Sequence, residues 1–301
     1  MTSSNVLQTR SEHLCHGGRV GFYSHASAAL GLDARFAVFV PPGATAVRPA
    51  PVVHVLAGLT CTEETFFIKA HALAEAARLG VALVATDTSP RGAHVPGEEE
   101  SWDFGTGAGF YLDATQEPWS QHYRMGSYIA QELPALTEQL FPLDGTRRGI
   151  MGHSMGGHGA LVHALRAPDF WKSVSAFAPI VHPSVVPWGE KAFTGYLGPD
   201  RQTWRAQDAV CLLEDGYRHP TDILIDQGEA DQFLERELKP DLLEEAAQKA
   251  GQALRIRRHT GYDHSYWFVQ SFAADHIRHH AAVLGDQKSF PVVGSNRAMT
   301  S

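Results

Sequence analysis

Apolar residues along this chain form either short continuous runs or segments with helical spacing. Continuous runs at 51–57 and 81–85 are typical of strands covered on both faces. Between them, apolar residues from Phe66 to Ala77 recur with helical spacing, up to Gly80. Further strands are expected at 19–25, 35–40, 173–178, 222–226 and 253–258, with another ending just before Ser154. Because strands alternate with helices, we predict an α/β protein whose mainly parallel sheet of about eight strands has helices on both faces.

Other helices are predicted at 123–140, with Pro134 as a kink or junction, and after Ser154 to Arg166, at 234–251 and at 265–284. Two long segments, 86–119 and 179–213, lack clear periodicity, and both carry several aromatic residues. Long insertions of this kind are typical of ordered functional loops. We expect a single domain at 1–286, with 1–10 as a loose lead-in, these two insertions, and a tail at 287–301.

Ser154 lies in Gly152-His153-Ser154-Met155-Gly156, between an apolar run and a helical segment of small residues. This is the nucleophile-elbow pattern, in which a serine sits on a strained turn between strand and helix. Glycines on either side let the two backbones approach closely, and the helix N-terminus favours an oxyanion. An ordinary glycine-rich turn is the alternative reading. The position of the motif after the fifth strand favours the elbow and indicates the α/β-hydrolase fold.

A serine nucleophile needs a base and an acid that orients the base. In this fold the order along the chain is serine, acid, histidine. Asp231 follows the strand 222–226, and His264 follows the strand 253–258, so both should lie at the carboxyl edge of the sheet. Asp226 and Glu229 are competing carboxylates, but Asp231 is better placed in the turn.

Other histidines offer weaker alternatives. His153 and His158 share the turn or helix of the nucleophile, so neither reaches its hydroxyl easily as a base. The spacing of His276, His279 and His280 suggests a metal site, but on a late amphipathic helix we interpret them as a solvated face. We therefore predict no metal.

An oxyanion hole needs two backbone N–H donors. The residue after the nucleophile, Met155, should supply one of them. The other should come from the loop after the strand 51–57, where we favour Leu59, with Thr60 as the alternative.

Composition narrows the class of protein. A net charge of -8 argues against a general nucleic-acid binder, and 44% hydrophobic residues can form a large core. The three cysteines are odd in number and far apart, which indicates reduced thiols in a cytoplasmic protein. Neither a signal peptide nor an apolar stretch of ~20 residues is found, so no membrane span is expected.

Several sequence blocks together resemble the S-formylglutathione hydrolase family, also called the esterase D family, over roughly 13–280. The blocks are Gly58-Leu59-Thr60-Cys61-Thr62-Glu63, Asp87-Thr88-Ser89-Pro90-Arg91-Gly92, Trp102-Asp103-Phe104-Gly105 with Gly107-Ala108-Gly109-Phe110-Tyr111, Gly152-His153-Ser154-Met155-Gly156-Gly157, Pro187-Trp188-Gly189 with Lys191-Ala192-Phe193, and Gly261-Tyr262-Asp263-His264-Ser265-Tyr266. Many blocks at matching spacing are far more specific than the serine motif alone.

The resemblance implies a serine thioesterase that hydrolyses S-formylglutathione to formate and glutathione in formaldehyde detoxification. It also implies a side activity on small carboxyl esters, no cofactor and a homodimer. By motif, the residues carried over are Ser154, Asp231 and His264 as the triad, Leu59 and Met155 at the oxyanion hole, Cys61 near the serine, and Trp102 and Trp188 near the acyl or glutathione pocket.

Two positions depart from the family pattern: Ala57 stands where many members have Ser, and Thr65 where many have Asn. Both could alter acyl preference. Cys61 and the two tryptophans could instead be ordinary core residues. Lys69 and Arg91 could offer charge to the glutathione carboxylates, but we assign neither to the site. The alternative functions are a general short-chain carboxylesterase, an acyltransferase with the same triad, and a non-catalytic binding protein.

Overall fold

The computed structural model describes residues 7–285 of the 301-residue chain, so the predicted tail at 287–301 lies outside the described part. A single nine-stranded sheet forms its centre, in the order β1-β2-β3-β5-β4-β6-β7-β8-β9. The strands are β1 (Gln8–Cys15), β2 (Gly18–Ser27), β3 (Leu32–Val40), β4 (Ala50–Leu56), β5 (Ala82–Thr86), β6 (Leu143–His153), β7 (Ser173–Phe177), β8 (Ile223–Gly228) and β9 (Leu254–His259). Strands from β5 to β9 in this order pair in parallel, whereas β1, β2 and β3 pair antiparallel.

The ninth strand is β1, which begins within the segment 1–10 that we expected to be a loose lead-in and extends to Cys15. It is an edge strand whose residues are nearly all exposed, so its sequence shows no buried face. Its pairing comes from a two-residue turn, in which His16 and Gly17 both have positive φ, 50° and 76°. Such turns match the twist of a hairpin. The prediction of about eight strands was therefore one strand short.

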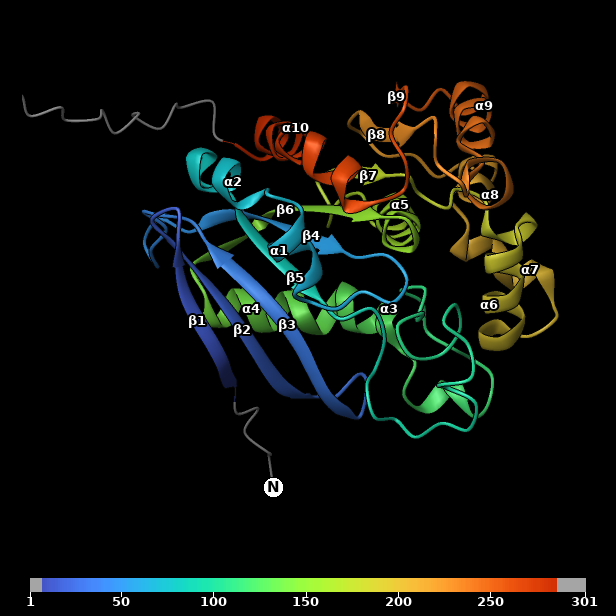
Figure 1. Ribbon diagram of the computed structural model, residues 1–301, viewed down its shortest axis with the longest axis horizontal. Helices are drawn as coiled ribbons and strands as arrows, with labels where there is room; N and C mark the ends of the chain where they lie inside the picture. Colours follow the sequence, from blue (N-terminus) through green and yellow to red (C-terminus); the bar gives the residue numbers. More distant parts are fainter. Residues whose placement is uncertain (1–6, 286–301) are drawn as a thin grey trace, which may run out of the picture.

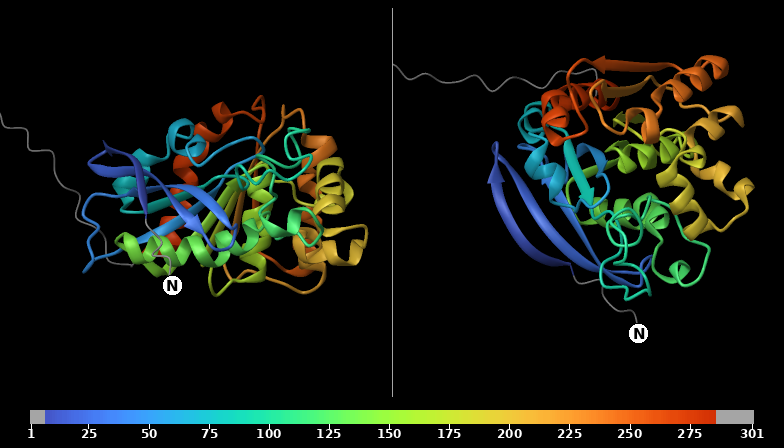
Figure 2. Two further views of the ribbon diagram at one scale, coloured as in Figure 1. Left: turned by 90° about the horizontal axis from the view of Figure 1, so that it is seen from below. Right: turned by 45° about the vertical axis from the view of Figure 1, so that its right-hand side comes forward.

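The helices lie on both faces of the sheet, as predicted (Figure 1). They are α1 (Thr65–Lys69), α2 (Leu73–Leu79), α3 (Met125–Ser127), α4 (Leu133–Leu140), α5 (Met155–Arg166), α6 (Pro187–Leu197), α7 (Arg201–Trp204), α8 (Ala209–Glu214), α9 (Pro240–Ala250) and α10 (Tyr266–Leu284). Helices α2 and α10 pack together on one face, and α4 and α5 lie on the other (Figures 1 and 2).

Several predicted helices are divided. The segment expected to be one helix from Phe66 to Gly80 is split into α1 and α2, because His71 adopts a left-handed conformation, φ 54°. The segment 123–140 changes from a π-helical turn to α4 at Leu133, next to the Pro134 expected to mark a junction. The segment 234–251 is likewise divided at Lys239, φ 49°.

The two predicted insertions differ from each other. From 87 to 118 the chain contains no helix or strand, as expected. The segment 179–213 instead contains α6, α7 and most of α8. These helices are short and are interrupted by Gly198 and by Asp208, which caps α8, so their periodicity is too brief to recognise in the sequence.

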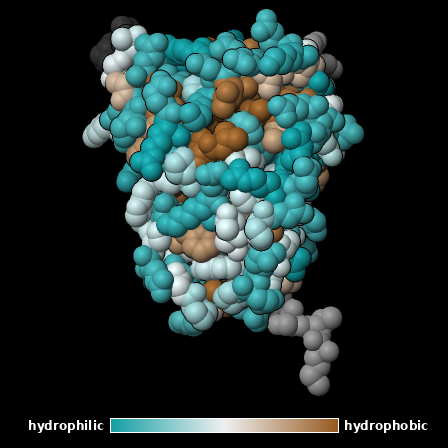
Figure 3. Space-filling model, turned by 90° about the vertical axis from the view of Figure 1, so that its right-hand side faces the viewer, coloured by the Kyte–Doolittle hydropathy of each residue, from teal (hydrophilic) through white to brown (hydrophobic). Residues whose placement is uncertain are grey.

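The central strands position the site. Every residue of β4, β5, β7 and β8 is buried, and burial on both faces accounts for the nearly continuous apolar runs of β4 and β5. Loops after β4, β6, β8 and β9 leave the sheet at its carboxyl edge, toward the right in Figure 1. Figure 3 looks onto that side of the molecule and shows hydrophobic side chains gathered within a largely hydrophilic face. Within residues 7–285, no helix has both the length and the apolar character needed to cross a bilayer.

Candidate active site

Ser154 occupies a sharp turn between β6 and α5, with φ 58° and ψ -118°. The Ser154 N–H donates to the Phe177 carbonyl at 2.9 Å, which ties the turn to β7. A Cβ atom at Gly152 would lie 2.1 Å from the Gly156 carbonyl oxygen, and one at Gly156 would lie 2.0 Å from the Leu56 oxygen. Because these contacts are with backbone atoms, only glycine fits at either position. The turn thus has the geometry of a nucleophile elbow.

Asp231 and His264 meet beside this turn. The His264 Nδ1–H donates to Asp231 Oδ2 at 2.6 Å, and the Asp231 carboxylate also accepts from the Phe233 N–H at 2.8 Å. The Asp231 side chain is fully buried, whereas 11% of the His264 side chain is exposed. The His264 ring lies 4.7 Å, centre to centre, from that of His153, the neighbour of Ser154. Within the described residues the Ser154 hydroxyl makes no hydrogen bond, so its contact with the imidazole stays a prediction.

The competing carboxylates are bound elsewhere. Arg257 donates to both Asp226 oxygens at 2.6 Å, and His276 contacts the same carboxylate at 3.2 Å. Burial would raise the pKa of Asp226, but these two partners outweigh it and hold the pKa below its usual range. Glu229 is exposed and accepts a hydrogen bond from Thr260. Asp231 is therefore the carboxylate that orients His264.

The expectation of a solvated histidine face on α10 was wrong. His276 and His280 are fully buried, and His279 is partly buried. His280 bonds the hydroxyls of Ser173 and Ser175 at 2.6 and 2.9 Å. This face of α10 packs on β7, whose serines satisfy the rings. Burial lowers the pKa of both His276 and His280, so the rings are neutral at physiological pH.

A second group with metal-ligand chemistry lies at His182, Asp208 and Cys211, whose ligand atoms are all within 4.8 Å of one another. Asp208 caps α8 by accepting from the Cys211 N–H at 3.1 Å, and it binds His182 Nδ1 at 2.7 Å. Burial, followed by the Asp208 charge, raises the pKa of the Cys211 thiol to about 12. The contacts of Asp208 with Cys211 and His182 are those of a helix cap and its hydrogen-bond partner.

Two backbone N–H groups are available for an oxyanion. Within residues 7–285, the N–H groups of Leu59 and Met155 have no acceptor. The Thr60 N–H instead donates to the Gly107 carbonyl at 2.9 Å. A Cβ atom on Gly58 would lie 3.2 Å from the Ser154 Cβ, so this loop runs directly beside Ser154. The geometry favours Leu59 over the alternative donor Thr60.

A row of aromatic rings leads from His264 to the surface. Phe233 lies 5.0 Å from the His264 ring, Trp188 lies 4.7 Å from Phe233, and Trp102 stands edge-on to Trp188 at 5.7 Å. Trp102 is 57% exposed and so is not a core residue, whereas Trp188 is buried. The sequence reasoning did not identify Phe233, although its position two residues after Asp231 could have indicated it.

Cys61 lies on the same loop as Leu59 and Thr60, after β4. It is partly buried, and burial raises the pKa of its thiol, so the thiolate is not favoured there. Tyr266 and Thr65 lie against the thiol. The Thr65 hydroxyl accepts from the Thr62 N–H at 3.0 Å, so this departure from the family pattern serves to hold the loop.

Comparisons with known proteins agree with this geometry. The family described as "Putative esterase" matches residues 27–279. An S-formylglutathione hydrolase of Mus musculus is 49% identical over 280 residues, covering 93% of this chain and 99% of the relative. One of Arabidopsis thaliana is 51% identical over 263 residues, covering 87% and 92%. A solved S-formylglutathione hydrolase from Agrobacterium tumefaciens is 51% identical, with a TM-score of 0.90, and covers 92% of this chain and 100% of its own.

Proposed function

This chain belongs to the putative esterase family, among relatives that are S-formylglutathione hydrolases, and from this we infer that it hydrolyses S-formylglutathione to formate and glutathione. We propose Ser154 as the nucleophile, His264 as the base and Asp231 as the acid. The observation that carries the proposal is the 2.6 Å contact between Asp231 and His264 next to the nucleophile elbow.

The geometry accounts for each step of acyl transfer. His264 Nε2 takes the proton of Ser154 as its oxygen attacks the formyl carbon, while Asp231 holds the Nδ1–H and stabilises the imidazolium. The N–H groups of Leu59 and Met155 stabilise the oxyanion. The imidazolium then protonates the departing glutathione sulfur. Water, activated by His264 as base, releases formate from the formyl-serine.

With a thioester substrate, the protein contributes to catalysis mainly by positioning the substrate and stabilising the oxyanion. A thiolate is a good leaving group, so little help is needed to break the bond. We propose that the aromatic row from Phe233 to Trp102 and the loop at Cys61 line the substrate pocket. Formyl is the smallest acyl group, and the close approach of Gly58 to Ser154 fits an acyl site with little room.

We also propose that each chain forms a single domain, and that the protein is a homodimer in the cytoplasm. Cys15, Cys61 and Cys211 are all free, which fits a reducing compartment. The dimer rests on the family resemblance, and sedimentation of the purified protein tests it.

A substrate panel tests the proposed function. We expect kcat/KM to be higher for S-formylglutathione than for its S-acetyl and S-lactoyl analogues or 4-nitrophenyl acetate, and a Ser154→Ala control to abolish all of these activities. Efficient turnover of 4-nitrophenyl acetate with poor turnover of S-formylglutathione would instead indicate a general carboxylesterase. Transfer of the acyl group to an added alcohol in preference to water would indicate an acyltransferase.

A further inference from the structure

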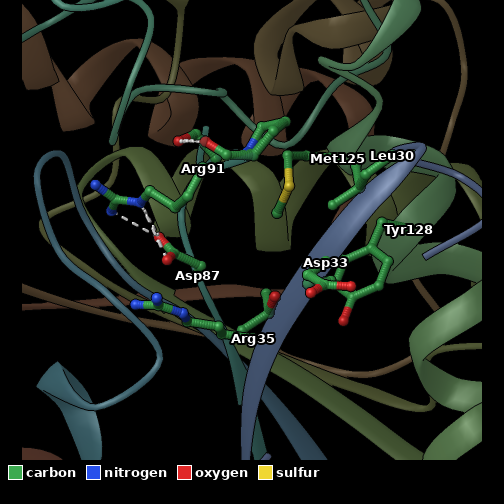
Figure 4. Close-up of a pocket in the computed structure, with 11 residues that line it drawn as sticks. Leu30, Asp33, Arg35, Asp87, Arg91, Met125 and Tyr128 are labelled. Carbon is green, nitrogen blue, oxygen red and sulfur yellow. Dashed lines mark hydrogen bonds and ion pairs between the residues drawn. The ribbon is translucent and has the colours of Figure 1, made fainter. Parts of the chain in front are cut away.

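The block Asp87-Thr88-Ser89-Pro90-Arg91-Gly92, directly after β5, has no role in the chemistry above. Its polar groups reach the loop 58–62, which we call the oxyanion loop, or the glycine-rich loop 105–109. Figure 4 shows Arg91 turned toward Asp87, with Arg35 and Asp33 nearby in the same small pocket. The block is therefore placed to hold these loops.

One contact is with the Cys61 carbonyl. It accepts from the Thr88 hydroxyl at 2.6 Å and from Arg91 Nη2 at 3.1 Å. Asp87 in turn holds the guanidinium, with Arg91 Nη2 at 2.7 Å and Nε at 3.1 Å from its carboxylate. The Asp87 side chain is almost fully buried, so this is a rigid support and not a mobile surface pair.

A second contact passes through the glycine-rich loop. The Ser89 hydroxyl accepts from the Gly107 N–H at 2.8 Å, and the Thr88 carbonyl accepts from the Gly109 N–H at 3.0 Å. The Gly107 carbonyl then accepts the Thr60 N–H. A Cβ atom at Gly107 would lie 3.1 Å from the Thr60 Cα, so the two loops are in close contact.

The oxyanion loop needs such support because its conformation is intrinsically disfavoured. Thr60 has φ 66°, a left-handed conformation that a β-branched residue adopts only when its surroundings impose it. This turn directs the Thr60 N–H toward Gly107 and leaves the Leu59 N–H without an acceptor in the described part of the chain. Holding Thr60 in this conformation thus determines which N–H can face the nucleophile.

We propose that Thr88 and Arg91 are positioning residues that hold the oxyanion loop so that the Leu59 N–H points at the reacting carbonyl oxygen. The inference rests on the proposed acyl-enzyme chemistry but not on the identity of the acyl group. The same contacts argue against Arg91 as a ligand for the glutathione carboxylates, because its guanidinium already binds Asp87 and the Cys61 carbonyl.

The test compares Thr88→Val, Arg91→Gln and Arg91→Lys with the wild type. Arg201→Gln is the matched control, since Arg201 pairs with Glu190 at the exposed surface of α7. Kinetics are measured with S-formylglutathione and with 4-nitrophenyl acetate. Affinity is measured for a trifluoromethyl ketone, which Ser154 converts to a bound oxyanion, and for S-methylglutathione, which has no carbonyl at its sulfur. Thermal unfolding shows whether each variant is folded.

We expect kcat to fall about 10- to 100-fold for both substrates in Arg91→Gln, with KM little changed, because small displacements of a catalytic group have effects of this size. Affinity for the ketone should fall by a similar factor, whereas affinity for S-methylglutathione should stay constant. Arg91→Lys should not restore activity, because an ammonium cannot bridge two partners as a guanidinium does. Added guanidinium should partly restore Arg91→Gln. Thr88→Val, close to isosteric, should show a smaller loss of the same kind.

Two results would overturn the proposal. If the variants lose thermal stability but keep kcat and ketone affinity, the block is merely structural. If Arg91→Gln raises KM and weakens S-methylglutathione binding while ketone affinity is kept, Arg91 binds substrate. Failure of the wild type to hydrolyse S-formylglutathione would refute the proposed function separately, and 4-nitrophenyl acetate would still test the two residues.

Discussion

Replacing Asp231 with Asn changes one charged oxygen into an amide nitrogen and leaves the shape of the side chain almost unaltered. All groups around the Asp231 carboxylate are donors: His264 Nδ1 at 2.6 Å and Gln227 Nε2 at 3.3 Å on Oδ2, and the Phe233 N–H at 2.8 Å on Oδ1. An Asn NH₂ group therefore faces a donor in either orientation. The orientation that keeps the Phe233 bond turns the NH₂ toward His264, and the imidazole must then present an unprotonated Nδ1.

In that tautomer the proton is on Nε2, which can no longer accept the proton of Ser154. We expect kcat to fall by about 10³- to 10⁴-fold, the size of effect known for an equivalent change in serine proteases. This corresponds to about 4 to 5.5 kcal/mol of transition-state stabilisation. KM should change little, because Asp231 is buried and its carboxylate is bonded to His264, Gln227 and Phe233.

The assay follows loss of the thioester in S-formylglutathione, with thermal unfolding to verify the fold. Asp263→Asn is the matched control, because Asp263 is the exposed carboxylate directly before His264 and bonds only Ser265 among the described residues. Activity of Asp231→Asn within tenfold of the wild type, or an equal loss in Asp263→Asn, would refute the assignment of the acid.

Two further predictions concern the pocket and pH. In steady-state kinetics, Trp102→Ala should raise KM for S-formylglutathione several-fold and leave kcat nearly unchanged. The reason is that the exposed ring lies at the outer end of the aromatic row. An unchanged KM would show that Trp102 does not line the pocket. Burial and the charge of Arg148 lower the pKa of His54 to about 3. Below pH ~6.5 the unfolded chain therefore binds a proton at this residue that the folded chain does not. The free energy of unfolding should consequently decrease as the pH falls from ~6.5 toward 3. His54→Leu should reduce that slope by up to about 1.4 kcal/mol per pH unit in urea unfolding, whereas His13→Leu at an exposed site should not; equal slopes in all three proteins would contradict this.

Local sequence determined much of the candidate active site. The continuous apolar runs of β4 and β5 predicted strands buried on both faces, because such strands have no polar side. The glycines around Ser154 indicated an elbow, because the close approach of β6 and α5 excludes any Cβ there. Asp231 and His264 followed from the order of strands, since the carboxyl ends of parallel strands share one edge.

Tertiary contacts decided the rest, because they join segments distant in the chain. Edge strand β1 has no buried face of its own, and its place is determined by pairing with β2. His276 and His280 are buried because serines on β7 supply partners about a hundred residues away. The choice between Leu59 and Thr60 depends on a carbonyl at Gly107. A sequence specifies which groups can donate or accept hydrogen bonds, but only the folded chain determines which of them meet.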